Sequence, residues 1–294
     1  MPVDLFSVLA LILLNAADLV QRIGPYVLGG IALAALLSQV IHRSFWQVLL
    51  RVPHLFAMPL AGLLGAISPL PTTSAVPMII RLRSKGLADS VALAFVLASS
   101  LMNPQLFLLT IGALGPKFAL GQLASVLLLS IGTSLLVARK GNSSWFVDED
   151  KSQFGTERQQ NGWMSLVTLA EHVTFYFLAG ALVGASVQVL LPWSGVLDWM
   201  SRCGWLSNPM LGWIGAPFYM CGGSAVPFAR SLMLSGFRQG TLFTFLLVGP
   251  VMRGTTLANL GCLLSKRSLA MCITALVLAG GILGCAFDWL VGAF

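Results

Sequence analysis

Apolar runs long enough to cross a bilayer recur along the whole chain, and short groups of glycine, proline and polar residues separate or interrupt them. A membrane-spanning helix needs about 20 predominantly apolar residues. Because lipid offers no hydrogen-bond partners, such runs must pair their backbone groups internally, as helices do. The pattern therefore predicts an all-α integral membrane protein, a polytopic helical bundle of about eight to ten membrane segments.

The composition supports the same class of protein. Only 9% of the 294 residues are charged and 57% are apolar, whereas soluble domains carry about 25% charged residues. The net charge of +7 does not indicate nucleic acid, because the basic residues are scattered near helix ends rather than gathered in a stripe. The five cysteines show no CxxC or Cys/His ligand spacing. We expect the lipid bilayer and a small-molecule solute as partners, with no nucleic acid and no cofactor or metal. The oligomeric state is left open.

The two halves of the chain match at a constant offset of 150 residues. Ser-Ala-Val-Pro at residues 74–77 recurs at residues 224–227. Repeats of this kind reveal duplicated structural units, and coincidences of Tyr, Pro, Phe and Gly at one offset are harder to dismiss than matches of Leu or Ala. Further matched pairs are Tyr26 and Tyr176, Gly30 and Gly180, Gly62 and Gly212, Gly86 and Gly236, Phe95 and Phe245, and Met102 and Met252.

A long polar stretch, about Arg139 to Asn161, lies between the halves and has the composition of a solvated linker. We therefore divide the chain into an N-terminal helix (1–19), a first membrane repeat (20–138), a polar linker (139–162) and a second membrane repeat (163–294). Each repeat has a plain span, two broken segments and a closing plain span, which gives an even number of crossings. The sequence thus predicts two tandem repeats in parallel orientation, related by an axis along the membrane normal.

Two segments in each half are too long and too rich in proline to be single helices. Residues 52–85 would reach roughly 50 Å as one helix, and they contain Pro69, Pro71 and Pro77, each of which removes a backbone donor. Such a segment must consist of two half-helices around a break, as a discontinuous span or as a re-entrant hairpin. The expected breaks lie at residues 68–77, 99–104, 219–227 and 249–254.

These breaks are the basis of the functional prediction. Non-helical backbone at membrane depth is tolerated only where it is buried in protein or lines an aqueous cavity. Paired interruptions at corresponding places of two halves are typical of a transporter binding site, although a single proline is often only a kink in a packed helix. We predict a permease, a secondary transporter or exporter, with a central site. The expected substrate-binding residues are Pro69, Thr72, Thr73, Ser74, Pro77, Asn103, Pro104, Cys221, Gly222, Gly223, Ser224, Pro227, Gly249, Pro250 and Arg253.

Arg253 stands at the position that matches Asn103. An arginine inside the membrane is costly and marks a functional site by default, and its fork of donors suits an oxyanion. The alternative is that Arg253 lies nearer an interface or bonds to carbonyls at a helix end. Half-helix N-termini also favour an anionic or polar solute.

The sequence offers no catalytic constellation. No Ser/His, HExxH or paired-carboxylate arrangement occurs in the predicted spans, so we expect that the protein is not an enzyme. A membrane-anchoring or channel subunit of a larger complex is the alternative from another class.

Four short motifs occur in a characteristic order: Ser68-Pro69-Leu70 with Pro77, Asn103-Pro104, Cys221-Gly222-Gly223 with Pro227, and Gly249-Pro250. In this order they resemble the predicted-permease family that contains the bacterial organoarsenical efflux permeases and the uncharacterised YraQ-like proteins. The resemblance implies a multi-pass permease of the bacterial inner membrane.

The chain departs from that family at the first break. The family has Cys-Ser-Cys-Gly where this chain has Pro-Thr-Thr-Ser at residues 71–74. Soft metalloid species want thiolate ligands, so metalloid or organoarsenical efflux is an alternative, and the hydroxyls favour a polar or anionic solute.

Overall fold

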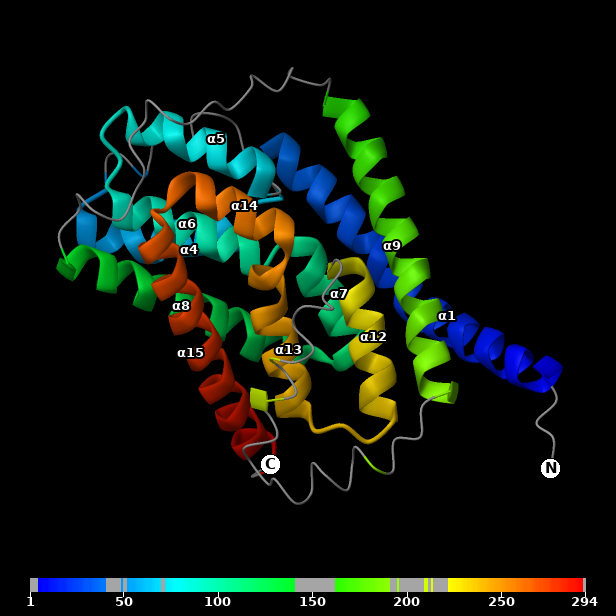
Figure 1. Cartoon of the computed structure of the whole chain (residues 1–294). Helices are drawn as coiled ribbons and strands as arrows, with labels where there is room; N and C mark the ends of the chain where they lie inside the picture. The colour runs from blue at the N-terminus through cyan, green and yellow to red at the C-terminus, as the bar shows by residue number, and fades with distance from the viewer. Residues whose placement is uncertain are drawn as a thin grey trace.

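The computed structural model describes residues 5–40, 49, 52–69, 72–140, 162–190, 195, 209–210, 213 and 222–292. These residues form helices and the short connections between them (Figure 1). The helices are α1 (Leu5–Val40), α4 (His54–Ile67), α5 (Thr72–Arg83), α6 (Asp89–Leu101), α7 (Pro104–Leu114), α8 (Pro116–Lys140), α9 (Gly162–Leu190), α12 (Gly222–Leu234), α13 (Gln239–Met252), α14 (Gly254–Leu263) and α15 (Lys266–Gly292).

Four of these helices are long and apolar enough to cross a membrane, within α1, α8, α9 and α15. Two bent pairs, α6 with α7 and α13 with α14, raise the number to six if each pair is one span. The protein is thus an all-helical, multi-pass membrane protein. The expected number of about eight to ten segments stays a prediction, because most of residues 191–221 lie outside the described part of the chain.

The first helix corrects one expectation. A short N-terminal helix followed by a separate span was expected, but α1 is one helix of 36 residues that continues through Pro25. The proline removes only the bond to the carbonyl four residues earlier, and membrane helices tolerate this loss where neighbouring groups satisfy the carbonyl.

The observed helix starts follow the offset of 150 residues found in the sequence. α5 and α12 begin at Thr72 and Gly222, and α7 and α14 begin at Pro104 and Gly254. The turns after α5 and α12 also correspond, because Gly86 and Gly236 both have φ of 97°. In each turn the glycine N–H and the next N–H return to carbonyls of the last helical turn, which is the Schellman arrangement.

The two long helices that open the halves, α1 and α9, run in opposite directions, which does not fit the expected parallel orientation. In Figure 1, α1 runs toward the upper left, whereas its neighbour α9 runs down the right-hand side in the opposite direction. The physical reason is the number of crossings. α4 and α5, with 14 and 12 residues, are each too short to span a bilayer. If each bent pair is one span, the described helices give three crossing segments in each half: α1, α6–α7 and α8, then α9, α13–α14 and α15.

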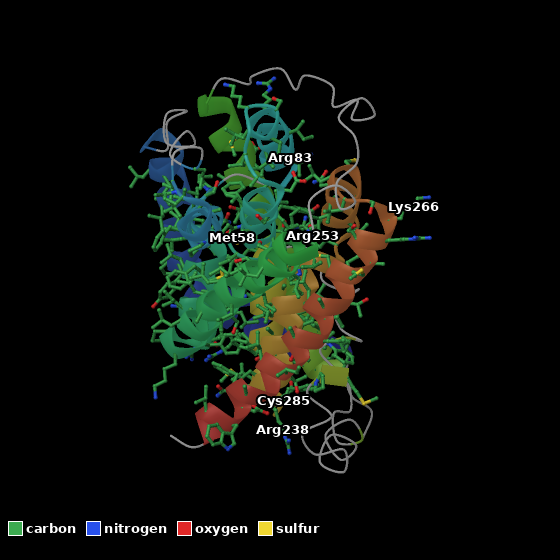
Figure 2. The ribbon with its side chains drawn as sticks, turned by 90° about the vertical axis from the view of Figure 1, so that its left-hand side faces the viewer. Met58, Arg83, Arg238, Arg253, Lys266 and Cys285 are labelled. Carbon is green, nitrogen blue, oxygen red and sulfur yellow. The ribbon has the colours of Figure 1, made fainter. Side chains whose placement is uncertain are left out.

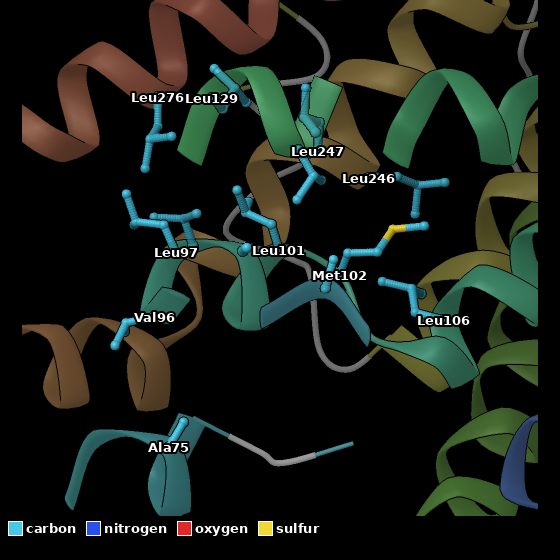
Figure 3. Close-up of a cluster of buried hydrophobic side chains, with 14 of the residues drawn as sticks. Ala75, Val96, Leu97, Leu101, Met102, Leu106, Leu129, Leu246, Leu247 and Leu276 are labelled. Atoms are coloured by element: carbon cyan, nitrogen blue, oxygen red, sulfur yellow. The ribbon is translucent and has the colours of Figure 1, made fainter. Parts of the chain in front are cut away.

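The core lies around α6 and α13, which are buried along nearly their whole lengths. Figure 3 shows leucines of α6, α7 and α13 packed against Leu129 of α8 and Leu276 of α15. Met102, at the α6–α7 break, is 1% exposed within this cluster. The core of the described fold is therefore largely apolar, although it also encloses polar side chains such as Gln122, Ser130 and Thr244.

Candidate functional site

The α6–α7 break consists of Met102 and Asn103, with a bend of 41° between the helices. Asn103 is extended, and its Oδ1 accepts a hydrogen bond from the N–H of Leu106 at 2.7 Å. Pro104 takes the first helical position, where its missing N–H costs nothing. Asn103 therefore caps α7, and this break falls inside the range expected from the sequence.

The α13–α14 break is the single residue Arg253, where the chain bends by 55°. The backbone of Arg253 is extended, and its carbonyl accepts the N–H of Leu257 to open α14. Gly249 and Pro250 were expected within this break, but both lie buried inside α13. Their expected role as substrate contacts stays a prediction.

Pro250 is accommodated by a bond from another helix. A proline at position 250 cannot donate to the carbonyl of Leu246, four residues earlier. Nε2 of Gln122, on α8, donates to that carbonyl instead at 3.4 Å. The matched carbonyl of Val96 in α6 accepts hydroxyl donors from Ser99 and Ser100 at 3.1 and 2.6 Å. Both halves thus place an extra donor on the same carbonyl, shortly before the break.

In both halves the helix that follows the first break begins earlier than expected. α4 ends at Ile67 and α5 begins at Thr72, so the break comprises residues 68–71 and Pro77 lies within α5. Pro227 likewise lies within α12. Each proline is in the second turn, where the carbonyl it leaves without a donor belongs to the first turn of the helix. The prolines therefore do not end these helices.

The predicted site residues around the first breaks are described to different extents. Ser68 is buried and Pro69 is partly buried. Cys221 lies outside the described residues, and Gly222 begins α12. The residues of α5 placed at its start by backbone alone are Thr72, Thr73, Ser74 and, further along, Pro77.

The start of α12 is packed tightly against α9. Gly223 and Ser224 are buried there. A Cβ on Gly180 of α9 would lie 2.7 Å from Cβ of Ser224 and 2.6 Å from its carbonyl oxygen, so the glycine permits this close approach. Ser224 is therefore at a helix–helix contact.

The four half-helices α5, α7, α12 and α14 point their N-terminal ends toward the middle of the molecule. Figure 1 shows α5 beside α14 and α7 beside α12, each pair running outward from the centre, and these are neighbours in space. The start of an α-helix has unpaired N–H groups and a partial positive charge of about half a unit. Four such ends make the centre favourable for an anion.

Arg253 lies among these ends. Figure 2 places it in the middle of the molecule, while Lys266 and Arg238 lie near the periphery. Its side chain is partly buried and makes no hydrogen bond or ion pair with any residue in the described part of the chain. A cation next to a helix N-terminus is unfavourable because both carry positive charge. An anion bound between Arg253 and these helix ends would relieve the repulsion.

Sequence reasoning missed Gln122. It is fully buried, and its Oε1 has no hydrogen-bond partner among the described residues. The available signal was a long polar side chain in the middle of an otherwise plain apolar span, at the position that matches Cys272.

A cavity of about 130 Å³ lies elsewhere, between α1, α7 and α12. The Asp18–Arg22 ion pair, at 2.8 Å, lies on its wall. Nη1 of Arg230 donates to the carbonyl of Ala113 at 2.6 Å, where a cation favours the C-terminal end of α7. These charges are satisfied structurally. Among the described residues, no group of three or more His, Cys, Asp or Glu side chains could hold a metal ion.

Comparison with known proteins gives a consistent result. The model of the ArsP_1 family, described as a predicted permease, matches residues 7–288. The chain is 25% identical over 271 residues to the UPF0718 protein YcgR of Bacillus subtilis (strain 168), covering 88% of this chain and 92% of that protein. No solved structure matches the chain.

Proposed function

Because the chain belongs to the ArsP_1 family of predicted permeases, we propose that it is a secondary transporter that moves a small anionic solute across the bacterial inner membrane. The observation that carries this proposal is the convergence of four half-helix N-termini on a region that contains Arg253. In transporters with repeated halves, discontinuous helices aim such ends at a solute near the middle of the bilayer.

The chemistry of the region suits an oxyanion. N–H groups at a helix start are free to donate, and guanidinium offers a planar fork of donors that matches carboxylate, phosphate and related groups. The proposed site comprises the helix starts at residues 72–74 and 222–224, together with Asn103, Pro104 and Arg253. Asn103 contributes chiefly by fixing the start of α7 through its cap.

The opposite directions of α1 and α9 support the same proposal. The half-helix pairs α5–α14 and α7–α12 each combine one helix from each half. A site built between two inverted halves can be reached from either side of the membrane in turn. A purely structural anchor would not need this arrangement.

The proposal is tested by flux into liposomes that contain the purified protein. A panel of labelled small oxyanions, metalloids and neutral metabolites separates the candidate solutes. We expect uptake of at least one oxyanion. Removal of a charge-assisted hydrogen bond costs about 1.5–3 kcal/mol, so Arg253→Gln should lower that uptake by roughly 10- to 100-fold, and Arg253→Lys should lower it less.

Arg267→Gln is the matched control, because Arg267 is exposed at the start of α15. This control should transport like the wild type. Transport of only neutral or metalloid species, unaffected by Arg253→Gln, would contradict an anionic substrate. No flux of any solute would favour a membrane-anchoring subunit.

A further inference from the structure

The two halves, although matched in sequence, pack differently against the α1–α9 pair. α1 packs on α7, and α9 packs on α12. By the offset of 150 residues, α7 corresponds to α14 and α12 corresponds to α5. If the packing were symmetric, α9 would also cover α14 and α1 would cover α5. Instead, the main neighbours of α14 among the described helices are α5, α13 and α15, so within this part of the chain the α1–α9 pair covers one of the two equivalent helix pairs.

The close contact between α1 and α7 depends on two glycines that face larger side chains. A Cβ on Gly112 of α7 would collide with the ring of Tyr26 and lie 2.9 Å from its Cβ. A Cβ on Gly30 would lie 3.1 Å from Cγ of Gln105. These two glycines therefore allow the helices to meet at van der Waals distance.

The corresponding residues exist in the other half but are not together in this structure. Tyr176 and Gly180 of α9 match Tyr26 and Gly30, and Cys262 and Thr255 of α14 match Gly112 and Gln105. Gly180 is packed on Ser224 of α12. Thr255 and Cys262 are exposed.

The exposed face of α14 has the composition of a helix–helix contact. Small residues are enriched where membrane helices pack, because they let backbones approach closely. Faces of this protein that are exposed elsewhere have large side chains, such as Leu28 on α1 and Ile282 on α15. The exposed residues of α14 follow one helical face and are all small: Gly254, Thr255, Ala258, Gly261 and Cys262.

We propose that this structure is one of two pseudo-symmetric states, and that in the other state α9 packs onto α14 through Tyr176–Cys262 and Gly180–Thr255. By the same symmetry, α1 packs onto α5, with Gly30 over Ser74. The exchange covers the starts of α5 and α14 and uncovers those of α7 and α12. It rests on the proposed transport function, because it exposes the central region alternately to the two sides of the membrane.

Two packings of this kind can be close in free energy. Matched helices present similar surfaces, so the packing of α1 and α9 on α7 and α12 is exchanged for related packing on α14 and α5. Because Cys262 has a side chain where Gly112 has none, α9 lies farther from α14 in that state than α1 lies from α7 here. α1 and α9 contact each other, so they can shift together as one unit. The core formed by α6 and α13 is buried throughout and provides a fixed centre for the motion.

Cysteine cross-linking in membranes tests the second state directly. In a chain whose only native cysteine is Cys262, Tyr176→Cys should form a disulfide on mild oxidation. The pair Tyr26→Cys and Gly112→Cys, in a cysteine-free chain, reports the state of this structure. A disulfide needs Cβ atoms about 3.5–4.5 Å apart, so either bond requires true helix contact. Cβ atoms at positions 26 and 112 would lie 2.9 Å apart in this structure, so a small separation of α1 and α7 brings the reference pair into this range. Phe175→Cys with Cys262 is the collision control, because Phe175 is exposed on another face of α9.

We expect both test pairs to cross-link and the control pair to stay reduced. Cross-linking of Tyr26→Cys with Gly112→Cys alone would overturn the proposed second state. Failure of both test pairs would overturn it as well. If Tyr176→Cys impairs folding, spin labels at Cys262 and at the exposed Thr174→Cys should show two distance populations, and a single population would contradict the exchange.

These outcomes are independent of flux. Flux without the Tyr176–Cys262 cross-link would leave a transporter that works by another motion. Both cross-links without any flux would support the exchange of packing and contradict the transport function.

Discussion

The side-chain amide of Gln122 donates to the backbone carbonyl of Leu246, 3.4 Å away, although the two residues are 124 positions apart. The bond joins the first half of the chain to the second. Leu246 needs this donor because Pro250 has no N–H to offer. A proline inside a core helix is thus stabilised by a polar side chain from a neighbouring helix.

This relationship predicts a specific coupling between Gln122 and Pro250. Gln122→Leu should destabilise the protein, because it leaves the Leu246 carbonyl without that donor. In a Pro250→Ala background the helix restores its own donor, so the same substitution should cost less by about 1 kcal/mol. The free energy of unfolding in detergent is measured for the wild type, the two single variants and the double variant, which together form a double-mutant cycle. Equal costs in both backgrounds would mean that the bond contributes nothing.

Gly180 should be intolerant of a side chain. Its Cβ would lie 2.7 Å from Cβ of Ser224, so Gly180→Ala forces α9 away from α12 and should cost about 1–3 kcal/mol. Gly132, on the exposed face of α8, has open space around it. Gly132→Ala is the matched control and should be neutral or stabilising by up to about 1 kcal/mol. Thermal unfolding of the two purified variants measures both effects. A tolerated alanine at position 180 would disprove the close contact.

The Arg83–Asp89 ion pair should join α5 to α6 across the turn at Gly86. Nε of Arg83 lies 2.7 Å from Oδ1 of Asp89, with side chains only 15% and 14% exposed. Double-mutant cycles with alanine should give a coupling of about 1 kcal/mol or more. The Asp18–Arg22 pair, whose side chains are 52% and 65% exposed, is the control and should couple by about 0.5 kcal/mol or less. Equal couplings would mean that burial does not strengthen the first pair.

The hydrophobic pattern was sufficient for the helices but not for their relative direction. The break at Met102 and Asn103 was correctly located, because Asn followed by Pro is a strong helix start. The opposite directions of α1 and α9 were not foreseen, because α4–α5 and α6–α7 have the same sequence signs of interruption. Only the observed helix lengths distinguish a segment that spans the bilayer from one that does not.

Prolines were the main source of misplaced break boundaries. Pro77, Pro227 and Pro250 were each taken as part of a break, yet all three lie inside helices. The sequence shows that a backbone donor is missing, but not whether another group replaces it. For Pro250 that group is Gln122, which comes from a distant part of the chain and could be identified only in three dimensions.

The charge preference at Thr255, next to Arg253 and the start of α14, tests most directly whether the helix ends attract anions. In an otherwise cysteine-free chain in membranes, Thr255→Cys can be treated with anionic and cationic thiosulfonate reagents, with a free thiol as the reference. We expect the anionic reagent to be favoured relative to the reference, and Arg253→Gln to weaken that preference. A preference for the cationic reagent, or no reaction with either, would contradict a water-accessible anion site at this position.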